Sequence, residues 1–149
     1  MTTDRPILLV EDNATDVLLI RRALTKASIS NPLHVVVNGD LAVAYLAGEA
    51  PYQDRQSHPL PGLVLLDLKL PKRSGLEVLS WVKTQPHLAR IPVVILTSSR
   101  LPGDVNGAYD RHANSYLVKP VQFDDLRRML EAVQEFWIRH AEPPDVGRS

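Results

Sequence analysis

The sequence contains no cysteine and has no excess of charge of either sign. The absence of cysteine excludes disulfide bonds, thiolate zinc sites and cysteine nucleophiles. The 17 basic and 17 acidic side chains leave a formal net charge of zero, and no basic run stands out, so no nucleic-acid partner is expected. No apolar stretch approaches the length of a membrane span, and no secretory signal is visible, so we expect a cytoplasmic protein without a membrane partner. A chain of 149 residues is long enough for one domain with its own core.

Short apolar runs are present instead, and four of them end on a reactive polar residue. Runs rich in Val, Ile and Leu are typical of strands that are buried on both faces of a parallel sheet. In such sheets, ligands bind outside the carboxyl ends of the strands. The four runs lead into Glu11-Asp12, Asp67, Thr97 and Lys119. The sequence therefore predicts that three carboxylates, a hydroxyl and an ammonium meet at one sheet edge, as a site for a divalent cation and a phosphoryl group.

Segments with helical periodicity alternate with the strand-like runs. The predicted helices cover Thr15 to Ala27, Leu41 to Leu46, Leu76 to a stop at Pro86, Asp104 to Arg111, and Phe123 to His140, and a further strand covers Leu33 to Val37. Right-handed crossovers then give an α/β fold, a doubly wound five-stranded parallel sheet in a three-layer α/β/α sandwich. We expect a single domain over residues 1–141 with an extended last helix, and a flexible tail over residues 142–149. Residues 48–62 hold three prolines and two glycines and predict a loop.

Three acidic residues are candidates for the metal site. Glu11 and Asp12 are adjacent at a strand end, so a bound cation would relieve their mutual repulsion, and Mg²⁺ prefers a few carboxylates with water and phosphate oxygens. The alternative is an exposed acidic pair that caps the following helix. Asp67 closes an apolar strand and could act as a nucleophile that forms an aspartyl-phosphate. A capping role for Asp67 fits less well, because Ser74, the candidate cap of the next helix, lies seven residues further on.

Two further positions complete the predicted site. Thr97 could donate a hydrogen bond to a phosphoryl oxygen, and Lys119 would place a compact positive charge beside it. Pro120 follows Lys119, and a cis bond between them would direct the lysine side chain back over the sheet edge. The alternatives are a threonine that only ends a strand and a surface lysine beside a turn. The order and the spacing of these residues, more than any single one of them, favour the functional interpretation.

The segments ILLVEDN, LLLDLKLPKRSG, VVILTSS and NSYLVKP resemble the four motifs of response-regulator receiver domains of two-component signalling. The resemblance extends over about residues 5–138 and implies a flavodoxin-like receiver fold. It implies that Asp67 is the phosphoacceptor and that Lys119 holds the phosphoryl oxygens. It also implies that the ligands of Mg²⁺ include Glu11, through water, Asp12, Asp67 and the backbone carbonyl of Lys69. Thr97 would be the switch hydroxyl, and Tyr116 the aromatic residue that moves inward with it.

A finer resemblance concerns the partner. The loop over residues 48–62, the segment HANSYLVKP and the ending EFW resemble the single-domain regulators that are paired with cyanobacterial phytochromes. This implies a histidine kinase of the phytochrome type as phosphodonor, and we expect a homodimer through the face that carries the output. Many family members have Gly where His112 stands, so either His112 or Asn114 must accept a positive φ.

Other functions remain open at this level. The protein could be a phosphorelay intermediate or a stand-alone chemotaxis-type regulator that is paired with another kinase. In either case it is not an enzyme but a phosphoacceptor, with phosphorylation from small donors and slow autodephosphorylation as its only chemistry. A magnesium-dependent aspartyl-phosphate phosphatase would need a second acid near the nucleophile, and Lys69 stands two residues after Asp67 instead. A nucleotide- or flavin-binding module lacks both G-x-G-x-x-G and a P-loop.

Overall fold

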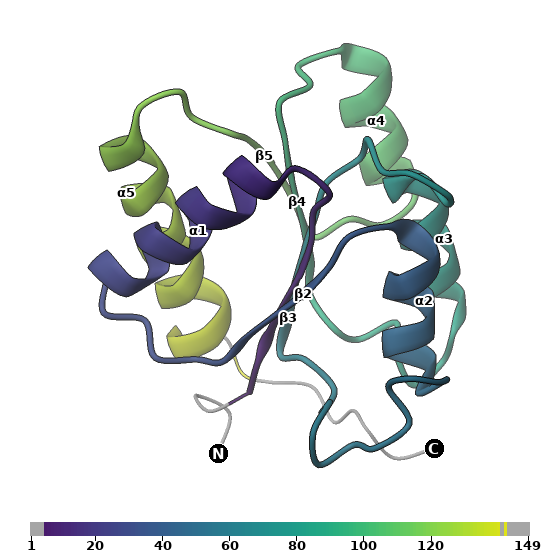
Figure 1. Cartoon of the computed structure of the whole chain (residues 1–149). Coiled ribbons are helices and arrows are strands. Elements are labelled where there is room, and N and C mark those ends of the chain that lie inside the picture. Colours follow the sequence, from purple (N-terminus) through teal and green to yellow (C-terminus); the bar gives the residue numbers. More distant parts are fainter. Residues whose placement is uncertain (1–4, 141, 143–149) are drawn as a thin grey trace.

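The computed structural model describes residues 5–140 and 142, and it places five parallel strands between two layers of helices (Figure 1). The sheet has the order β2-β1-β3-β4-β5. Its strands are β1 (Ile7–Val10), β2 (Leu33–Val36), β3 (Leu63–Leu66), β4 (Val93–Thr97) and β5 (Ser115–Val118). The helices are α1 (Ala14–Lys26), α2 (Gly39–Ala47), α3 (Gly75–Thr84), α4 (Pro102–Asp110) and α5 (Phe123–Val133), which continues as the π-helix η2 (Gln134–His140). This confirms the predicted doubly wound α/β/α sandwich.

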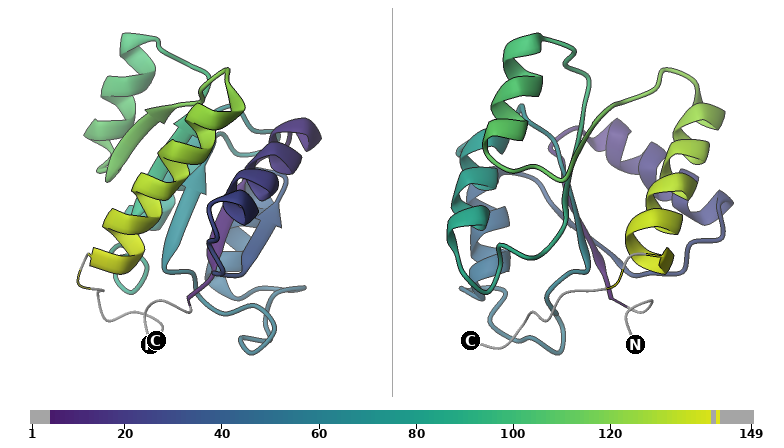
Figure 2. Two further views of the ribbon diagram at one scale, coloured as in Figure 1. Left: turned by 90° about the vertical axis from the view of Figure 1, so that its left-hand side faces the viewer. Right: turned by 180° about the vertical axis from the view of Figure 1, so that it is seen from behind.

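The helices divide between the two faces of the sheet. α1 and α5 cover one face, and α2, α3 and α4 cover the other, as the views from the side and from behind show (Figure 2). The three central strands β1, β3 and β4 are buried along their whole length. Their side chains alternate between two apolar clusters, so that Leu8 and Val10 face α2 and α3 while Ile7 and Leu9 face α1 and α5. Burial on both faces explains why these strands are apolar at every position.

Local hydrogen bonds define where two of the helices begin. The side chain of Asn13 accepts a hydrogen bond from the backbone N–H of Asp16 at 2.9 Å and so caps α1. Ser74 caps α3 in a reciprocal capping box with Glu77, with bonds of 3.2 and 2.9 Å. Ser74 is the cap that the sequence predicts. Apart from the end of α5, the helices begin and end within about three residues of their predicted bounds, which is usual for boundaries inferred from sequence.

The end of the last helix differs from the expectation. α5 gives way at Gln134 to a wider π-helix, whose seven residues are too few for apolar periodicity to distinguish it from an α-helix. In this segment Trp137 packs on the cluster beneath α1 and α5, whereas Phe136 is 59% exposed. The expected positive φ is found at His112, with a value of 69°. The predicted tail over residues 142–149 lies outside the described residues except for residue 142.

The loop between α2 and β3 is folded against the end of the molecule that lies lowest in the view of Figure 1. The guanidinium of Arg55 donates to the carbonyls of Tyr45 and Leu46, at 2.8 Å each, and thereby satisfies the end of α2. The Tyr45 hydroxyl donates to the carbonyl of Pro59 at 2.9 Å, and burial raises the pKa of Tyr45 to about 12. His58 lies within ring-contact distance of Tyr45, with centroids 5.8 Å apart. The loop is therefore an ordered part of the domain, distant from the carboxyl ends of the strands.

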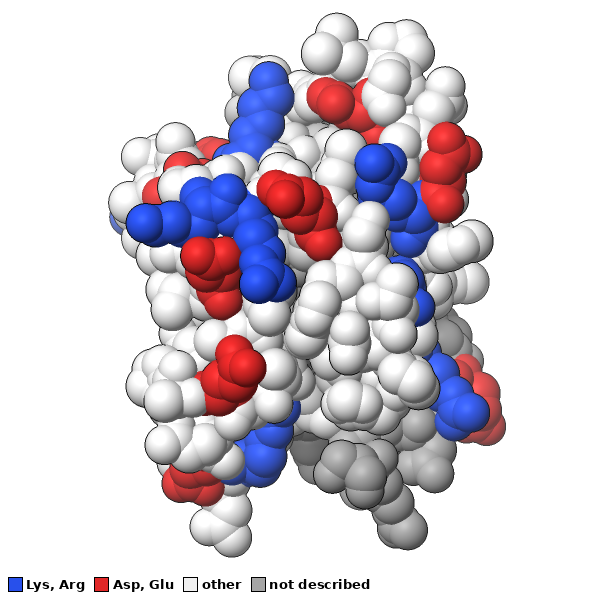
Figure 3. All heavy atoms as spheres, turned by 90° about the vertical axis from the view of Figure 1, so that its right-hand side faces the viewer, with Lys and Arg blue, Asp and Glu red and all other residues white. Residues whose placement is uncertain are grey.

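The surface over α2, α3 and α4 carries mixed charge. Basic and acidic side chains are interspersed there, and neither sign gathers into a continuous patch among the described residues of this face (Figure 3). Within residues 5–140, no helix is long and apolar enough to cross a membrane.

Candidate functional site: the carboxyl edge of the sheet

The predicted site residues meet at the edge where the parallel strands end. In the register of the sheet Val10 lies beside Leu66, so the residues that follow them leave the sheet side by side. The pairing continues beyond the strands, because the N–H of Asp67 donates to the carbonyl of Val10 at 3.1 Å. The N–H of Lys119 likewise donates to the carbonyl of Thr97, at 2.8 Å. The backbone therefore brings together residues that are more than 100 positions apart in the chain.

The acidic residues of the site form a compact cluster. Carboxylate oxygens of Glu11, Asp12 and Asp67 all lie within 4.8 Å of one another. Glu11 is 1% exposed and Asp67 is 7% exposed, whereas Asp12 faces solvent. Burial raises the pKa of Glu11, the charge of Asp67 raises it further, and a hydrogen bond from Lys119 opposes the shift. Three converging oxygen donors fit a hard divalent cation, which would offset this repulsion.

Lys119 lies at the centre of the acidic groups. Its ammonium donates to Glu11 Oε1 at 2.6 Å, to Asp16 Oδ2 at 2.8 Å and to Asp67 Oδ2 at 3.0 Å. Burial alone would lower the pKa of Lys119, but the bonds to Asp16, Glu11 and Asp67 outweigh it and raise the pKa well above its usual range. The lysine is therefore charged at any physiological pH.

Asp16 is the one member of this network that the sequence analysis missed. It lies in the first turn of α1, where an acid is also expected simply because it interacts favourably with the helix dipole. One signal was available, because Asp16 lies six positions after Val10, in the first turn of the helix that begins at the edge of the sheet. That signal does not select Asp16 over the neighbouring polar residues Asn13 and Thr15.

The carboxylate of Asp67 is held by its own backbone. Its Oδ1 accepts a hydrogen bond from the N–H of Leu68 at 2.7 Å and a longer one from the N–H of Lys69 at 3.4 Å. Burial raises the pKa of Asp67, but hydrogen bonds from Thr97 and Lys119 outweigh it, so the pKa is lowered overall. Asp67 is therefore an ionised carboxylate at neutral pH, as a nucleophile must be.

Helix α3 approaches the backbone of Asp67 and Leu68 closely because it begins with a glycine. A Cβ atom on Gly75 would lie 2.2 Å from the carbonyl oxygen of Asp67 and 2.5 Å from the Cα atom of Leu68. The N–H of Gly75 donates to the carbonyl of Leu68 at 2.9 Å. The absence of a side chain thus allows the loop after β3 to fold tightly on itself and sets the position of Asp67.

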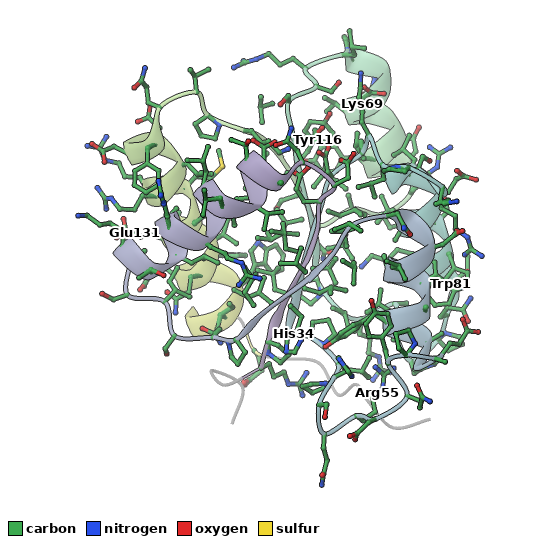
Figure 4. All side chains as sticks on the ribbon, in the orientation of Figure 1. His34, Arg55, Lys69, Trp81, Tyr116 and Glu131 are labelled. Atoms are coloured by element: carbon green, nitrogen blue, oxygen red, sulfur yellow. The ribbon has the colours of Figure 1, made fainter. Side chains whose placement is uncertain are left out.

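Tyr116 and Lys69 lie at the same edge, from β5 and from the loop after β3 (Figure 4). Tyr116 is half-buried, and its hydroxyl donates to the carbonyl of Ser99 at 2.9 Å. Ser99 lies two residues after Thr97, and its own hydroxyl donates to Asp104 of α4 at 2.5 Å. These bonds connect the loop after Thr97 with β5 and with the start of α4.

The prediction of a cis peptide bond before Pro120 is wrong. Among the described residues the only cis peptide bond joins Ala50 and Pro51, so the bond between Lys119 and Pro120 is trans. The reason is visible in the geometry of Lys119. Its backbone N–H continues the pairing with β4, and its side chain reaches three carboxylates from this trans backbone. No reversal of the chain is needed to aim the ammonium over the sheet edge.

An open pocket of about 750 Å³ contains the whole arrangement. Its walls include the predicted residues Glu11, Asp12, Asp67, Lys69, Thr97 and Lys119, together with Asp16 and the loop from Ser98 to Leu101. Tyr116 does not line the pocket. The arrangement offers an ionised nucleophile, a cluster of oxygen ligands and a fixed positive charge in one solvent-accessible space. This combination suits phosphoryl transfer, in which catalysis depends mainly on positioning and charge stabilisation.

Comparison with known proteins gives a consistent result. Residues 7–131 match the family of response regulator receiver domains. The chain is 42% identical over 132 residues to the probable methanogenesis regulatory protein FilR2 of Methanothrix harundinacea, with 89% of this chain and 83% of that protein covered. It is 40% identical over 138 residues to the response regulator Rcp1 of Synechocystis sp., with 93% of this chain and 92% of Rcp1 covered.

Solved structures agree with the sequence comparison. The phosphorylated cyanobacterial phytochrome response regulator RcpA superimposes with a TM-score of 0.87 at 39% identity, covering 95% of this chain and 99% of RcpA. The Mn²⁺-bound form of Rcp1 gives a TM-score of 0.84 at the same identity and coverage.

Proposed function

The chain belongs to the family of response regulator receiver domains, and from this we propose that it accepts a phosphoryl group on Asp67 from a histidine kinase and signals through the resulting change of conformation. One observation supports this most directly. The Asp67 carboxylate lies 3.0 Å from the Lys119 ammonium and within 4.8 Å of the oxygens of Glu11 and Asp12. The nucleophile, the positive charge and the oxygen ligands are thus in reach of one phosphoryl group.

The chemistry assigns a separate task to each residue. An Oδ atom of Asp67 forms a bond to phosphorus while the bond between phosphorus and the nitrogen of the donor histidine breaks. The electron pair stays on the imidazole, which takes up a proton from water. Lys119 binds the phosphoryl oxygens, and Thr97 donates a hydrogen bond to one of them from the end of β4.

Glu11, Asp12 and Asp67 would hold the divalent cation, together with the backbone carbonyl of Lys69. We propose Mg²⁺ as the natural ion, since two or three carboxylates with water and phosphate oxygens are its preferred surroundings. When bound, it would neutralise charge that develops on the phosphoryl oxygens. The domain is not a conventional enzyme, because the product of the transfer stays on its own side chain, and hydrolysis of that acyl phosphate would reset it.

A phytochrome-type histidine kinase is the proposed partner. Relatives at 39–40% identity are the response regulators Rcp1 and RcpA, and RcpA is a cyanobacterial phytochrome response regulator. The expected output is a homodimer formed on phosphorylation through the face of α4, β5 and α5. Tyr109 of α4 is 49% exposed, and Phe136, in the continuation of α5, is 59% exposed. Sedimentation of the phosphorylated and unphosphorylated protein at equal concentration tests this step, and monomers in both samples would refute it.

The primary test is the intact mass after incubation with acetyl phosphate and Mg²⁺, beside an Asp67→Asn control. We expect one added phosphoryl group in the wild type and none in the variant. A gain in both proteins would place the phosphoacceptor elsewhere, and a gain in neither would refute acceptance from small donors. Transfer from an autophosphorylated phytochrome kinase, compared with a kinase of another class, then tests the partner.

A further inference from the structure

Helix α1 contributes a third carboxylate to the Lys119 ammonium, and neither the metal cluster nor the nucleophile accounts for it. Asp16 Oδ2 lies 2.8 Å from Lys119 Nζ, closer than Asp67 Oδ2 at 3.0 Å. The Asp16 side chain is 32% exposed, whereas the Lys119 side chain is 12% exposed. Asp16 therefore reaches from the surface toward a largely buried cation, and it is outside the group of acids whose oxygens converge on the proposed cation.

The hydrogen-bonding capacity of Lys119 is fully used in this arrangement. An ammonium has three N–H donors, and each has a carboxylate acceptor here, from Glu11, Asp16 and Asp67. A phosphoryl group on Asp67 would bring new oxygens that compete for the same donors. Lys119 must then keep some of its three partners and exchange others. Of these three, Asp16 is the one that does not belong to the acids of the proposed cation site.

We propose that Asp16 is a positioning residue that holds the Lys119 ammonium beside Asp67 from the α1 side. Asp16 keeps the Lys119 ammonium within reach of an incoming phosphoryl group. Because Asp16 shares the ammonium, Asp67 is not the main partner of Lys119. In this way the first turn of α1 is tied to the phosphorylation state of Asp67. This inference rests on the proposed phosphoacceptor function and adds to it a residue that acts only through Lys119.

An acid in the first turn of a helix also stabilises the helix dipole, so the test needs a control that separates the two effects. Asp125 provides it. It is the third residue of α5, as Asp16 is the third residue of α1, and its ion pair is with exposed Arg128 at 3.6 Å. Asp16→Asn and Asp125→Asn therefore remove the same charge from the same helical position, but only the first removes a partner of Lys119.

The measurement is the rate of phosphorylation by acetyl phosphate at saturating Mg²⁺ for each variant, followed by intact mass. We expect Asp16→Asn to slow the reaction about three- to tenfold, because one charged hydrogen bond that orients Lys119 is lost, and Asp125→Asn to leave it unchanged. Asp16→Glu, which keeps the charge, should recover most of the rate. In a Lys119→Met background, where no ammonium remains to be positioned, Asp16→Asn should have less than about a twofold effect.

A second readout does not depend on the reaction. The three hydrogens of Lys119 are all bonded, so the ammonium should give a slowly exchanging ¹H–¹⁵N signal in the wild type and in Asp125→Asn, and this signal should be lost in Asp16→Asn. Equal rates and equal signals for Asp16→Asn and Asp125→Asn would overturn the proposal. So would a full effect of Asp16→Asn in the Lys119→Met background. A wild type that takes up no phosphoryl group from acetyl phosphate would instead refute acceptance from small donors, and the ammonium signal would still decide the role of Asp16.

Discussion

The close approach of α3 to the loop that contains Asp67 leads to a prediction about Gly75. Replacing Gly75 by alanine adds one methyl group to a buried position. The new Cβ would lie 2.2 Å from the carbonyl oxygen of Asp67 and 2.5 Å from Cα of Leu68, and both are backbone atoms that cannot rotate away. The substitution therefore forces either the start of α3 or the loop after β3 to move.

The magnitude follows from the nature of this clash. Forcing extra methyl groups into packed interiors costs typically about 1–3 kcal/mol. Alanine favours helices over glycine by up to about 1 kcal/mol, which offsets part of this cost. We expect Gly75→Ala to lower the free energy of unfolding by about 1–2 kcal/mol, and to lower Tm by about 2–8 °C for a chain of this size. Displacement of Asp67 should also slow its phosphorylation.

Gly103 offers a matched control. It lies at the second position of α4, is exposed, and a Cβ atom there would have no neighbour within 4 Å. Gly103→Ala should leave the stability unchanged or raise it by about 0.5–1 kcal/mol, since alanine reduces the freedom of the unfolded chain. Urea unfolding followed by circular dichroism measures both variants. If Gly75→Ala proved as stable as Gly103→Ala, the close approach of α3 would not determine the position of Asp67.

Three further predictions concern groups away from the site. Lys83 donates to two backbone carbonyls and one amide oxygen at 3.0–3.1 Å. Lys83→Met should therefore lower the free energy of unfolding, measured in urea, by about 2–3 kcal/mol. A change below about 0.5 kcal/mol would show that these bonds contribute little. Arg55→Lys removes the paired hydrogen bonds to the end of α2. We expect faster proteolysis within residues 48–62 while the rest of the domain stays intact, and an unchanged rate of cleavage would contradict this. Burial, with a smaller effect of His58, lowers the pKa of His34 below 6.5. The folded state therefore binds fewer protons than the unfolded state, and this contribution to stability is complete above pH 6.5 and is lost as the pH falls. Unfolding measured from pH 8 to pH 5 should show a shallower decline in His34→Gln than in the wild type.

The charge network explains why the site needs tertiary structure. Glu11, Asp16, Asp67 and Lys119 come from three separate parts of the chain, and in the unfolded state their charges are solvated and independent. Folding brings the three carboxylates within 3.0 Å of the Lys119 nitrogen. Burial there strengthens both the repulsion between the carboxylates and their pairing with the ammonium. A phosphoryl group on Asp67 would compete for these bonds. The bonds of Ser99 to Tyr116 and Asp104 connect the site with β5 and α4.

Much of the fold could be predicted from local patterns. The three central strands are apolar at every position because helices cover both faces of the sheet, and this pattern is visible without coordinates. The cap residues Asn13 and Ser74 were likewise predictable, because capping depends on neighbours a few positions away. The order of the strands and their polar ends then placed Asp67, Thr97 and Lys119 at one edge, since parallel strands all end on the same side.

The remaining features depend on contacts between distant segments. The trans bond before Pro120 was not predictable, because the isomers of such bonds differ by only about 0.5–1 kcal/mol and the surrounding structure decides between them. The π-helical end of α5 spans only seven residues, too few for apolar periodicity to show that the helix widens. The role of Asp16 as a partner of Lys119 depends on the angle at which α1 crosses the sheet edge. The sequence by itself determined the fold class and most of the composition of the site, because both follow from local patterns and strand order. Only the tertiary structure decided which charges pair, because a hydrogen bond depends on distances of a few tenths of an ångström between residues that the chain keeps far apart.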